Sequence, residues 1–243
     1  MDLEDAVAPD PKEAARHQIA AAILERGYGQ RELIVRTNSL YSPWGEDDLK
    51  AVSGMGADAV LLPKVEGRGM VLEAMAIVDQ VGGPTDLPIW CMMETPLAML
   101  HAEEMAFAQK RVGCLVMRTS DLAKDLRSTH TLSRTPLVTS LELCILAARA
   151  AGIGILDGVH VDLFDEDGFR VSCVQGLELG MDGKTLIHPK TIAAANEVFA
   201  PTADEIEWSQ RIIKEHAAAE VADKGVLLVN GELVENLHVE NAH

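Results

Sequence analysis

The sequence has few aromatic residues, few cysteines and a deficit of positive charge. Its 243 residues include 21 Lys and Arg against 38 Asp and Glu, which gives a net charge of −17 at pH 7. Because nucleic-acid-binding surfaces need clustered cations to match the phosphate backbone, this deficit argues against nucleic-acid binding. Cys91, Cys114, Cys144 and Cys173 are far apart and form no CxxC pair, so they indicate neither a zinc site nor a disulfide framework.

The sequence also lacks an apolar run long enough to span a membrane. The longest, from Cys144 to Leu156, contains Arg149 and falls short of the roughly 18 to 20 residues that a membrane helix requires. No basic segment followed by an apolar one opens the chain, so we expect no secretion signal. With 48% hydrophobic residues the chain can bury a substantial core. These features predict a cytoplasmic globular protein without membrane or nucleic-acid partners.

Short apolar, β-branched runs recur along the chain, and a helical pattern separates each pair of them. This alternation is typical of βα units around a parallel sheet. The runs predict six strands, at residues 33–35, 59–62, 89–93, 114–117, 153–161 and 185–187. A strand end at residues 2–6 brings the count to seven βα units. We therefore expect an α/β fold, a (β/α)8 TIM barrel that lacks its first βα unit; an open, doubly wound sheet is the alternative.

Three helix starts carry capping signals. Asp10, followed by Pro11 and Glu13, predicts a capping box that opens the first helix. Thr95 and Thr202 predict similar caps for two later helices.

The sequence pattern changes after residue 200. A long helix is predicted from about residue 202 to 224, and Asn230-Gly231 then separates two alternating apolar runs, a strong signal for a two-residue hairpin. We expect residues 1–200 to form the barrel domain. Residues 201–243 are expected to form a C-terminal helix and β-hairpin arm that docks on the same barrel or, as we favour, on a neighbouring subunit.

Polar side chains end several of the predicted strands, at the barrel face where catalytic groups lie. Glu94 and Asp121 end consecutive strands, so their carboxylates can face one point. Two oxygen ligands with room for water suit Mg²⁺. The structural alternative is that each acid is favoured by the positive end of a helix. The other strand-end polar residues are Glu4, Asp5, Arg36, Asn38, Lys64, Glu66, Asp157, His160 and His188.

Two strand-end cations each have two interpretations. Arg36 can hold a carboxylate or carbonyl oxygen of a ligand, or form a structural ion pair with Glu4 or Asp5. Lys64 suggests a Schiff-base lysine, but the nearby acids favour a role as their charge partner. Neither a phosphate-loop motif, nor a dinucleotide-binding glycine pattern, nor an HExxH pair is present, which argues against an ATPase, a nicotinamide enzyme and a zinc hydrolase.

Seven segments, in this order along the chain, resemble the citrate lyase beta-subunit-like CoA ester lyases of the HpcH/HpaI aldolase superfamily. They are DLEDAV at 2–7, VRTN at 35–38, LPKVE at 62–66, MET at 93–95, SDL at 120–122, IHP at 187–189 and LVENLH at 233–238. Each motif is weak alone, but the ordered set is specific and spans nearly the whole chain.

The resemblance implies a Mg²⁺-dependent barrel, a homotrimer or a multiple of it. Its expected reaction cleaves or forms a carbon–carbon bond in a malyl-, citramalyl- or citryl-CoA type thioester, with a 2-oxo acid and acetyl-CoA as products. The resemblance assigns the metal to Glu94 and Asp121, and Glu94 also to the substrate site. It places Arg36 on the thioester carbonyl and on the enolate that develops there.

Further site residues come only from the resemblance. Glu4 and Asp5 are expected to line the catalytic site as partners of metal-bound water and of the arginine. Glu235 is expected to act in proton transfer, delivered from a neighbouring subunit.

The chain departs from the family pattern in three places. The first βα unit is missing, Glu235 stands where several related lyases have aspartate, and Arg118 precedes Thr119-Ser120 where the family has a glycine-threonine-asparagine-like loop. A long cation at Arg118 can occupy space near the metal or contact a CoA phosphate. Three alternatives stay open: a citrate lyase beta subunit that acts on an acyl-carrier-protein thioester, a pyruvate aldolase of the same superfamily, and a truncated, non-catalytic homologue.

Overall fold

A computed structural model of the protein describes residues 1–221, 227–229, 232–234 and 239. The chain divides into two compact units, Met1–Ala195 and Asn196–His243. No helix in the described part of the chain is both long and apolar enough to cross a membrane.

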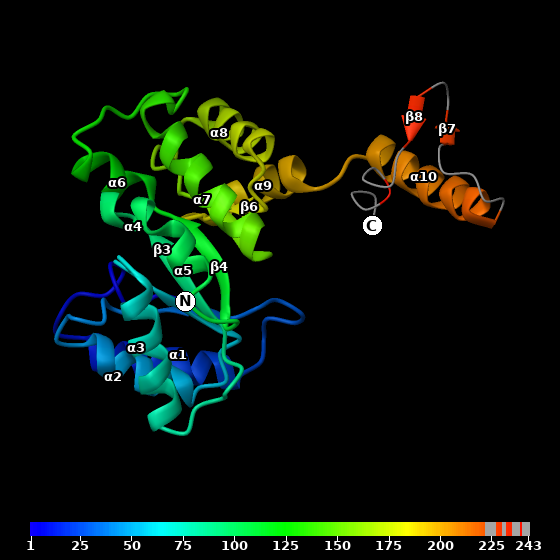
Figure 1. Ribbon diagram of the computed structural model, residues 1–243. Coiled ribbons are helices and arrows are strands. Elements are labelled where there is room, and N and C mark those ends of the chain that lie inside the picture. The colour runs from blue at the N-terminus through cyan, green and yellow to red at the C-terminus, as the bar shows by residue number, and fades with distance from the viewer. Residues whose placement is uncertain (222–226, 230–231, 235–238, 240–243) are drawn as a thin grey trace. The chain divides into compact units, whose positions relative to one another are not determined.

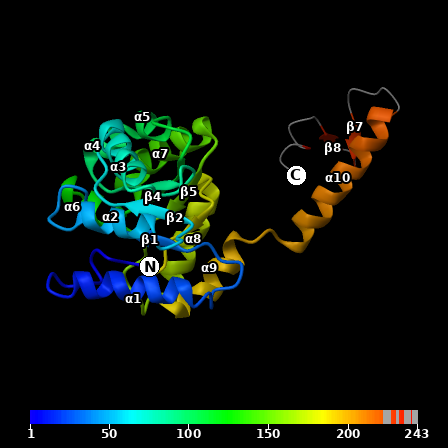
Figure 2. The ribbon, with the colours of Figure 1, turned by 90° about the horizontal axis from the view of Figure 1, so that it is seen from below.

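A curved sheet of six parallel strands forms the centre of the described part of the first unit (Figures 1 and 2). The strands are β1 (Ile34–Arg36), β2 (Ala59–Leu62), β3 (Ile89–Met93), β4 (Val112–Met117), β5 (Gly154–Asp157) and β6 (Gly183–Lys184). They lie in sequence order, and Asp2 adds a parallel bridge to Arg36 beyond β1. A doubly wound sheet would reverse its strand order in the middle, so this order favours part of a (β/α)8 barrel.

Five of the six predicted strands overlap strands of the structure, and some of them differ at their ends. Those at 59–62 and 89–93 are confirmed at both ends. The predicted strand at 153–161 stops at Asp157, because its side chain accepts a hydrogen bond from the Gly158 N–H at 2.8 Å and turns the chain. The prediction at 185–187 is wrong, since β6 lies two residues earlier and Ile187 is 55% exposed.

Helices connect and cover the strands. In the first unit they are α1 (Lys12–Leu24), α2 (Gly45–Ser53), α3 (Arg68–Gln80), α4 (Pro96–Leu100), α5 (Ala102–Ala106), α6 (Thr119–Asp125), α7 (Val138–Ala151) and α8 (Glu166–Leu179), followed by α9 (Ile192–Phe199). Short 3-10 turns lie at Thr135–Leu137 and Pro189–Thr191.

Two of the three predicted helix caps are confirmed. Thr95 accepts a hydrogen bond from the Ala98 N–H at 3.1 Å, and Thr202 exchanges hydrogen bonds with Glu205. The predicted capping box at Asp10 is wrong, because α1 begins at Lys12 without a side-chain cap. The buried Lys12 ammonium donates instead to the Leu3 and Glu4 carbonyls, each at 2.7 Å, and this contact fixes the start of α1.

All four cysteines are buried and carry free thiols. Burial raises the pKa of Cys91, Cys114 and Cys144 to about 12. Because the thiolate is the reactive form, we predict that the native protein at pH 8 reacts with a chromogenic disulfide reagent orders of magnitude more slowly than the denatured chain. Stopped-flow absorbance in buffer and in guanidinium measures both rates. A thiol that reacts at the denatured rate in buffer would contradict this packing.

The second unit contains α10 (Ala203–Val221), β7 (Leu227–Val229) and β8 (Glu232–Val234). The two strands pair antiparallel, with Leu228 opposite Leu233. The Asn230-Gly231 turn and Glu235 lie outside the described residues. The docking of this arm on a neighbouring subunit therefore stays a prediction.

Candidate active site

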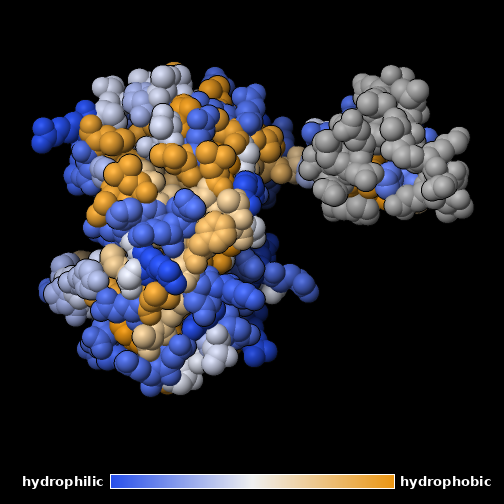
Figure 3. All heavy atoms as spheres, viewed as in Figure 1, coloured by the Kyte–Doolittle hydropathy of each residue, from blue (hydrophilic) through white to orange (hydrophobic). Residues whose placement is uncertain are grey.

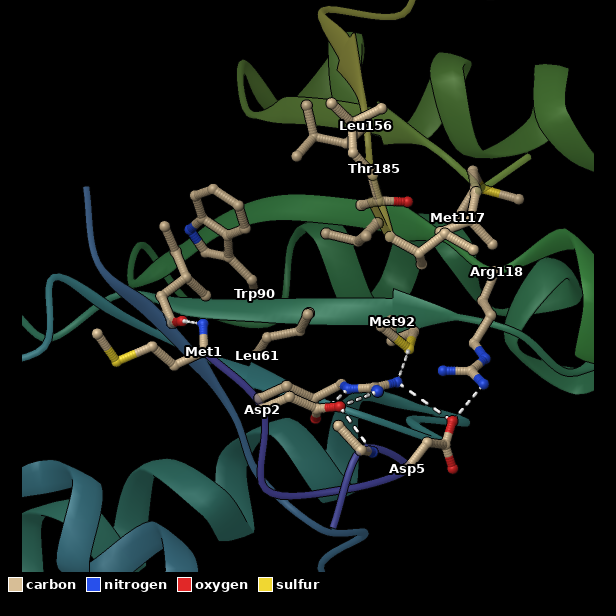
Figure 4. A pocket seen from close by; sticks show the side chains of 17 residues that line it. Met1, Asp2, Asp5, Leu61, Trp90, Met92, Met117, Arg118, Leu156 and Thr185 are labelled. Carbon is tan, nitrogen blue, oxygen red and sulfur yellow. Dashed lines mark hydrogen bonds and ion pairs between the residues drawn. The ribbon is translucent and has the colours of Figure 1, made fainter. Parts of the chain in front are cut away.

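A cavity of about 720 Å³ runs along the strands, from Ile34 and Trp90 near their amino ends to Arg36 and Arg118 at their carboxyl ends (Figure 4). Its volume lies in the range of small-molecule sites. Its apolar lining comes mainly from the strands and includes Leu61, Trp90, Met92, Val116 and Leu156. Its polar lining includes Asp2, Asp5, Arg36 and Arg118. The cavity therefore has an apolar wall formed by the strands and a charged end formed by Asp2, Asp5, Arg36 and Arg118.

Arg36, the last residue of β1, is held by a two-pronged contact with Asp2. Its Nε lies 2.7 Å from Asp2 Oδ1, and its Nη2 lies 2.6 Å from Asp2 Oδ2. The remaining nitrogen, Nη1, lies 2.7 Å from Glu4 Oε2 and 3.6 Å from Asp5 Oδ2. A bidentate contact of this kind fixes the plane of the guanidinium as well as its position.

The charges around Arg36 keep it ionised. Burial alone would lower the pKa of Arg36, but the hydrogen bond and charge of Asp2, together with the charge of Glu4, raise it above its ordinary value. Conversely, burial opposes ionisation of Asp2, yet the Arg36 contacts lower the pKa of Asp2 overall. The predicted ion pairs with Glu4 and Asp5 are present. The principal partner, Asp2, was not predicted.

Glu94, directly after β3, is almost completely buried at 1% exposure. Its Oε1 accepts a hydrogen bond from the Lys64 N–H at 2.6 Å, and its Oε2 lies 3.5 Å from Lys64 Nζ. Lys64 has a φ of 53°, in the left-handed region, which turns its N–H toward the carboxylate. Such strain at a non-glycine residue often marks a functional site.

The strain at Lys64 predicts a difference between two variants. Lys64→Gly and Lys64→Ala both remove the ammonium, but only glycine adopts the left-handed backbone freely. We expect Lys64→Gly to be more stable than Lys64→Ala by about 0.5 to 1 kcal/mol. Urea unfolding followed by circular dichroism measures the difference. Equal free energies of unfolding would show that the left-handed backbone carries no cost.

Arg118 follows β4 and contacts acids from three parts of the chain. Its Nε hydrogen-bonds Asp121 and lies 3.6 Å from Glu94 Oε2. Its Nη2 hydrogen-bonds Asp5 (Figure 4). Its Nη1 lies 3.7 Å from Glu4 Oε2. Burial opposes its charge, but the contacts with Asp121 and Asp5 raise the pKa of Arg118.

Glu4 has an unsatisfied oxygen. Its Oε2 is buried and accepts no hydrogen bond, although two guanidinium groups lie near it. Burial and the charges of Asp5 and Glu94 raise the pKa of Glu4, against the opposing effect of Arg36. A buried oxygen that accepts no hydrogen bond often has a further partner in an ion, a water molecule or a ligand.

The charge balance of this cluster tests whether a metal ion fits. Five carboxylates, those of Asp2, Glu4, Asp5, Glu94 and Asp121, face three cations, those of Arg36, Lys64 and Arg118. These side chains have a net charge of −2, which one divalent cation balances. Glu94 and Asp121 also offer oxygen ligands around one point, and Mg²⁺ takes one or two carboxylates and keeps several waters. The donor set fits Mg²⁺, although no three acidic, histidine or cysteine side chains in the described part of the chain form a complete metal cluster.

Other strand-end residues that the sequence singled out have structural roles. Asp157 is fully buried and binds Arg134 and Lys184, each at 2.7 Å. Asn38 donates to Asp48 and to the Leu3 carbonyl. His188 accepts a hydrogen bond from the Lys190 N–H at 3.2 Å and caps the second 3-10 turn.

The sequence and the fold both resemble known proteins. Residues 1–189 match the HpcH/HpaI aldolase/citrate lyase family. A (3S)-malyl-CoA thioesterase of Cereibacter sphaeroides is 46% identical over 242 residues, and the match covers 100% of this chain and 82% of that relative. The citrate lyase subunit beta of Escherichia coli K12 is 34% identical, with coverage of 100% and 82%.

A solved structure is also similar in sequence and fold. The CitE protein of Mycobacterium tuberculosis, in complex with magnesium, acetoacetate and coenzyme A, is 25% identical with a TM-score of 0.77. The match covers 100% of this chain and 85% of that one. The chain belongs to the HpcH/HpaI aldolase/citrate lyase family.

Proposed function

We propose that this enzyme is a Mg²⁺-dependent carbon–carbon lyase of hydroxyacyl-CoA thioesters, of the malyl-, citramalyl- or citryl-CoA type. The products of cleavage are a 2-oxo acid and acetyl-CoA. The observation that carries the proposal is one cluster of charged side chains in which Arg118 contacts Glu94 and Asp121 and shares Glu4 with Arg36. The net charge of −2 on the side chains of this cluster favours a divalent cation. The magnesium and coenzyme A of the related CitE structure support the same assignment.

Glu94 and Asp121 would hold the magnesium ion. When bound, Mg²⁺ supplies a Lewis acid and a template for the oxygens of the oxo acid. The Lys64 N–H fixes Glu94 through Oε1, so that Oε2 is the oxygen left facing Asp121 and Arg118. Because this contact is a backbone one, the position of Glu94 depends on the strained turn after β2.

Arg36 would stabilise the negative charge that grows on the thioester oxygen during cleavage. Asp2 occupies Nε and Nη2, so Nη1 is the donor that the guanidinium directs toward Glu4, Asp5 and the cavity. A fixed donor aimed at developing charge lowers the barrier because it needs no reorganisation during the reaction.

Glu4 and Asp5 would line the site as partners of Arg36 and of water. The raised pKa of Glu4 suits a group that exchanges protons with such water. Glu235, the acid expected to transfer the substrate proton, lies outside the described residues, and its role remains part of the proposal.

A homotrimer, or a multiple of it, also remains a proposal. Large exposed apolar side chains on α4, α7 and α8 include Leu100, Leu146 and Val171, and Figure 3 shows an apolar area on the half of the first unit that carries these helices. Such areas often mark contacts between subunits. Light scattering after size exclusion measures the oligomer directly.

Hydrolysis of the same thioester is the second candidate function. It is favoured by one finding, the 46% identity to a (3S)-malyl-CoA thioesterase. The two reactions differ in their products. A lyase releases a 2-oxo acid and keeps the thioester bond in acetyl-CoA, whereas a thioesterase releases free CoA thiol and a hydroxy acid.

The test is a product analysis on the purified protein. Malyl-, citramalyl- and citryl-CoA are incubated with Mg²⁺ and then with EDTA, and a citryl-acyl-carrier-protein thioester is included for the citrate lyase alternative. Phenylhydrazine detects the 2-oxo acid and a disulfide reagent detects free thiol. We expect the protein to release a 2-oxo acid and no free thiol. This release should stop in EDTA and return when excess Mg²⁺ is added. Free thiol without 2-oxo acid would establish the thioesterase, and neither product from folded protein would favour the non-catalytic homologue.

A further inference from the structure

Arg118 lies where the proposed metal site would form. Its Nε hydrogen-bonds Asp121 and lies 3.6 Å from Glu94 Oε2, so one nitrogen faces both of the carboxylates that would coordinate Mg²⁺. This inference rests on the proposed function, because it concerns the same two acids.

The Arg118 Nε lies between the two carboxylate oxygens that a shared cation would bind. Glu94 Oε1 already accepts the Lys64 N–H, which leaves Oε2, with Lys64 Nζ at 3.5 Å and Arg118 Nε at 3.6 Å, as its ligand atom. Asp121 Oδ2 is the atom that accepts the hydrogen bond from Arg118 Nε. A cation placed between these two oxygens has to displace the guanidinium nitrogen, since the two would occupy the same space.

The far end of the Arg118 side chain has other partners. Its Nη2 hydrogen-bonds Asp5, and its Nη1 lies 3.7 Å from Glu4 Oε2, both on the segment beside β1. The side chain is 26% exposed and lines the cavity, so it has room to move. Loss of the Nε contacts therefore leaves the guanidinium held by Asp5 and Glu4, next to Arg36.

We propose that Arg118 and a divalent cation are alternative counter-ions of Glu94 and Asp121. In the metal-free protein the guanidinium holds the two acids together. When the ion binds, the guanidinium gives up Asp121 and Glu94 and keeps Asp5 and Glu4. Arg118 is then a positioning residue that prearranges the metal ligands and, because it competes for them, weakens metal binding.

The test compares Mg²⁺ binding by calorimetry in the wild-type protein, Arg118→Ala and Arg118→Gln. The glutamine variant keeps a polar side chain if alanine fails to fold. We expect both variants to bind Mg²⁺ about tenfold more tightly or better, which corresponds to about 1.4 kcal/mol. Lys124→Ala is the matched control, because it removes one cation from α6 at an exposed position whose contact is Asp125. Its affinity should change less than twofold.

Thermal unfolding gives a second readout that is independent of activity. If the guanidinium and the metal ion substitute for each other, Arg118→Gln should have a lower melting temperature than the wild-type protein in EDTA. Saturating Mg²⁺ should reduce this difference in melting temperature. Equal or weaker Mg²⁺ affinity in both Arg118 variants, with binding intact in the wild-type protein, would overturn the competition. If none of these proteins binds Mg²⁺, both the proposed competition and the metal site of the proposed function are wrong.

Discussion

Replacing Glu94 by glutamine should lower Mg²⁺-dependent cleavage at least about a thousandfold while leaving the fold intact. The amide oxygen still accepts the Lys64 N–H, so the turn after β2 keeps its hydrogen bond. The charged oxygen that faces Asp121 and Arg118 is lost, and with it a ligand of the Lewis acid. A thousandfold loss corresponds to about 4 kcal/mol of transition-state stabilisation. Asp121→Asn should act in the same direction.

The control for this prediction makes the same chemical change elsewhere. Glu103→Gln alters an exposed acid in α5 and should keep full activity. Protection of the four buried thiols from a disulfide reagent reports that each variant has folded. If Glu94→Gln turns over within tenfold of the wild-type rate, Glu94 is not a ligand of the metal.

Replacing Arg36 by lysine should lower kcat about a hundredfold, with an equal fall in kcat/KM. Lysine keeps the positive charge between Asp2 and Glu4 but cannot form the two-pronged contact with Asp2 that orients Nη1. Loss of one oriented donor to developing charge typically costs 10²- to 10³-fold in kcat. An equal fall in both constants indicates an interaction that forms only in the transition state.

A second arginine on the same protein supplies the matched control. Arg149 makes a similar fork with Asp182, at 3.1 and 2.6 Å, at an exposed position. Arg149→Lys should leave both kinetic constants unchanged. If Arg36→Lys turns over as fast as Arg149→Lys, the orientation of Arg36 does not contribute to catalysis.

The strands that sequence reasoning located best are those buried on both faces. Ala59–Leu62 and Ile89–Met93 are continuous apolar runs, which is the pattern of a central parallel strand. β6 was misplaced because Gly183–Lys184 carries no such run. Its place is set by pairing with Leu156 and Asp157, which a local pattern cannot reveal.

In the candidate site too, local patterns predicted some residues, whereas others depend on contacts between distant parts of the chain. The sequence predicted that Glu94 and Asp121 lie near each other because acids that end neighbouring parallel strands meet at one edge, and the structure brings both to the Arg118 guanidinium. The exclusion of Asp157 from the site depends on Arg134 and Lys184, which lie 23 and 27 residues away and reach it only through the fold. The sequence did not identify Asp2 as the partner of Arg36, because the two residues are 34 positions apart and meet only through the fold.

The most direct test of a divalent-cation site beside Arg36 is an anomalous difference map from crystals of the protein soaked in Mn²⁺. Manganese prefers the same octahedral oxygen surroundings as magnesium. We predict a single strong peak within about 2.0 to 2.3 Å of carboxylate oxygens of Glu94 and Asp121, with Arg118 turned toward Asp5. A peak elsewhere, or a map in which Arg118 still bridges the two acids at saturating Mn²⁺, would contradict the account.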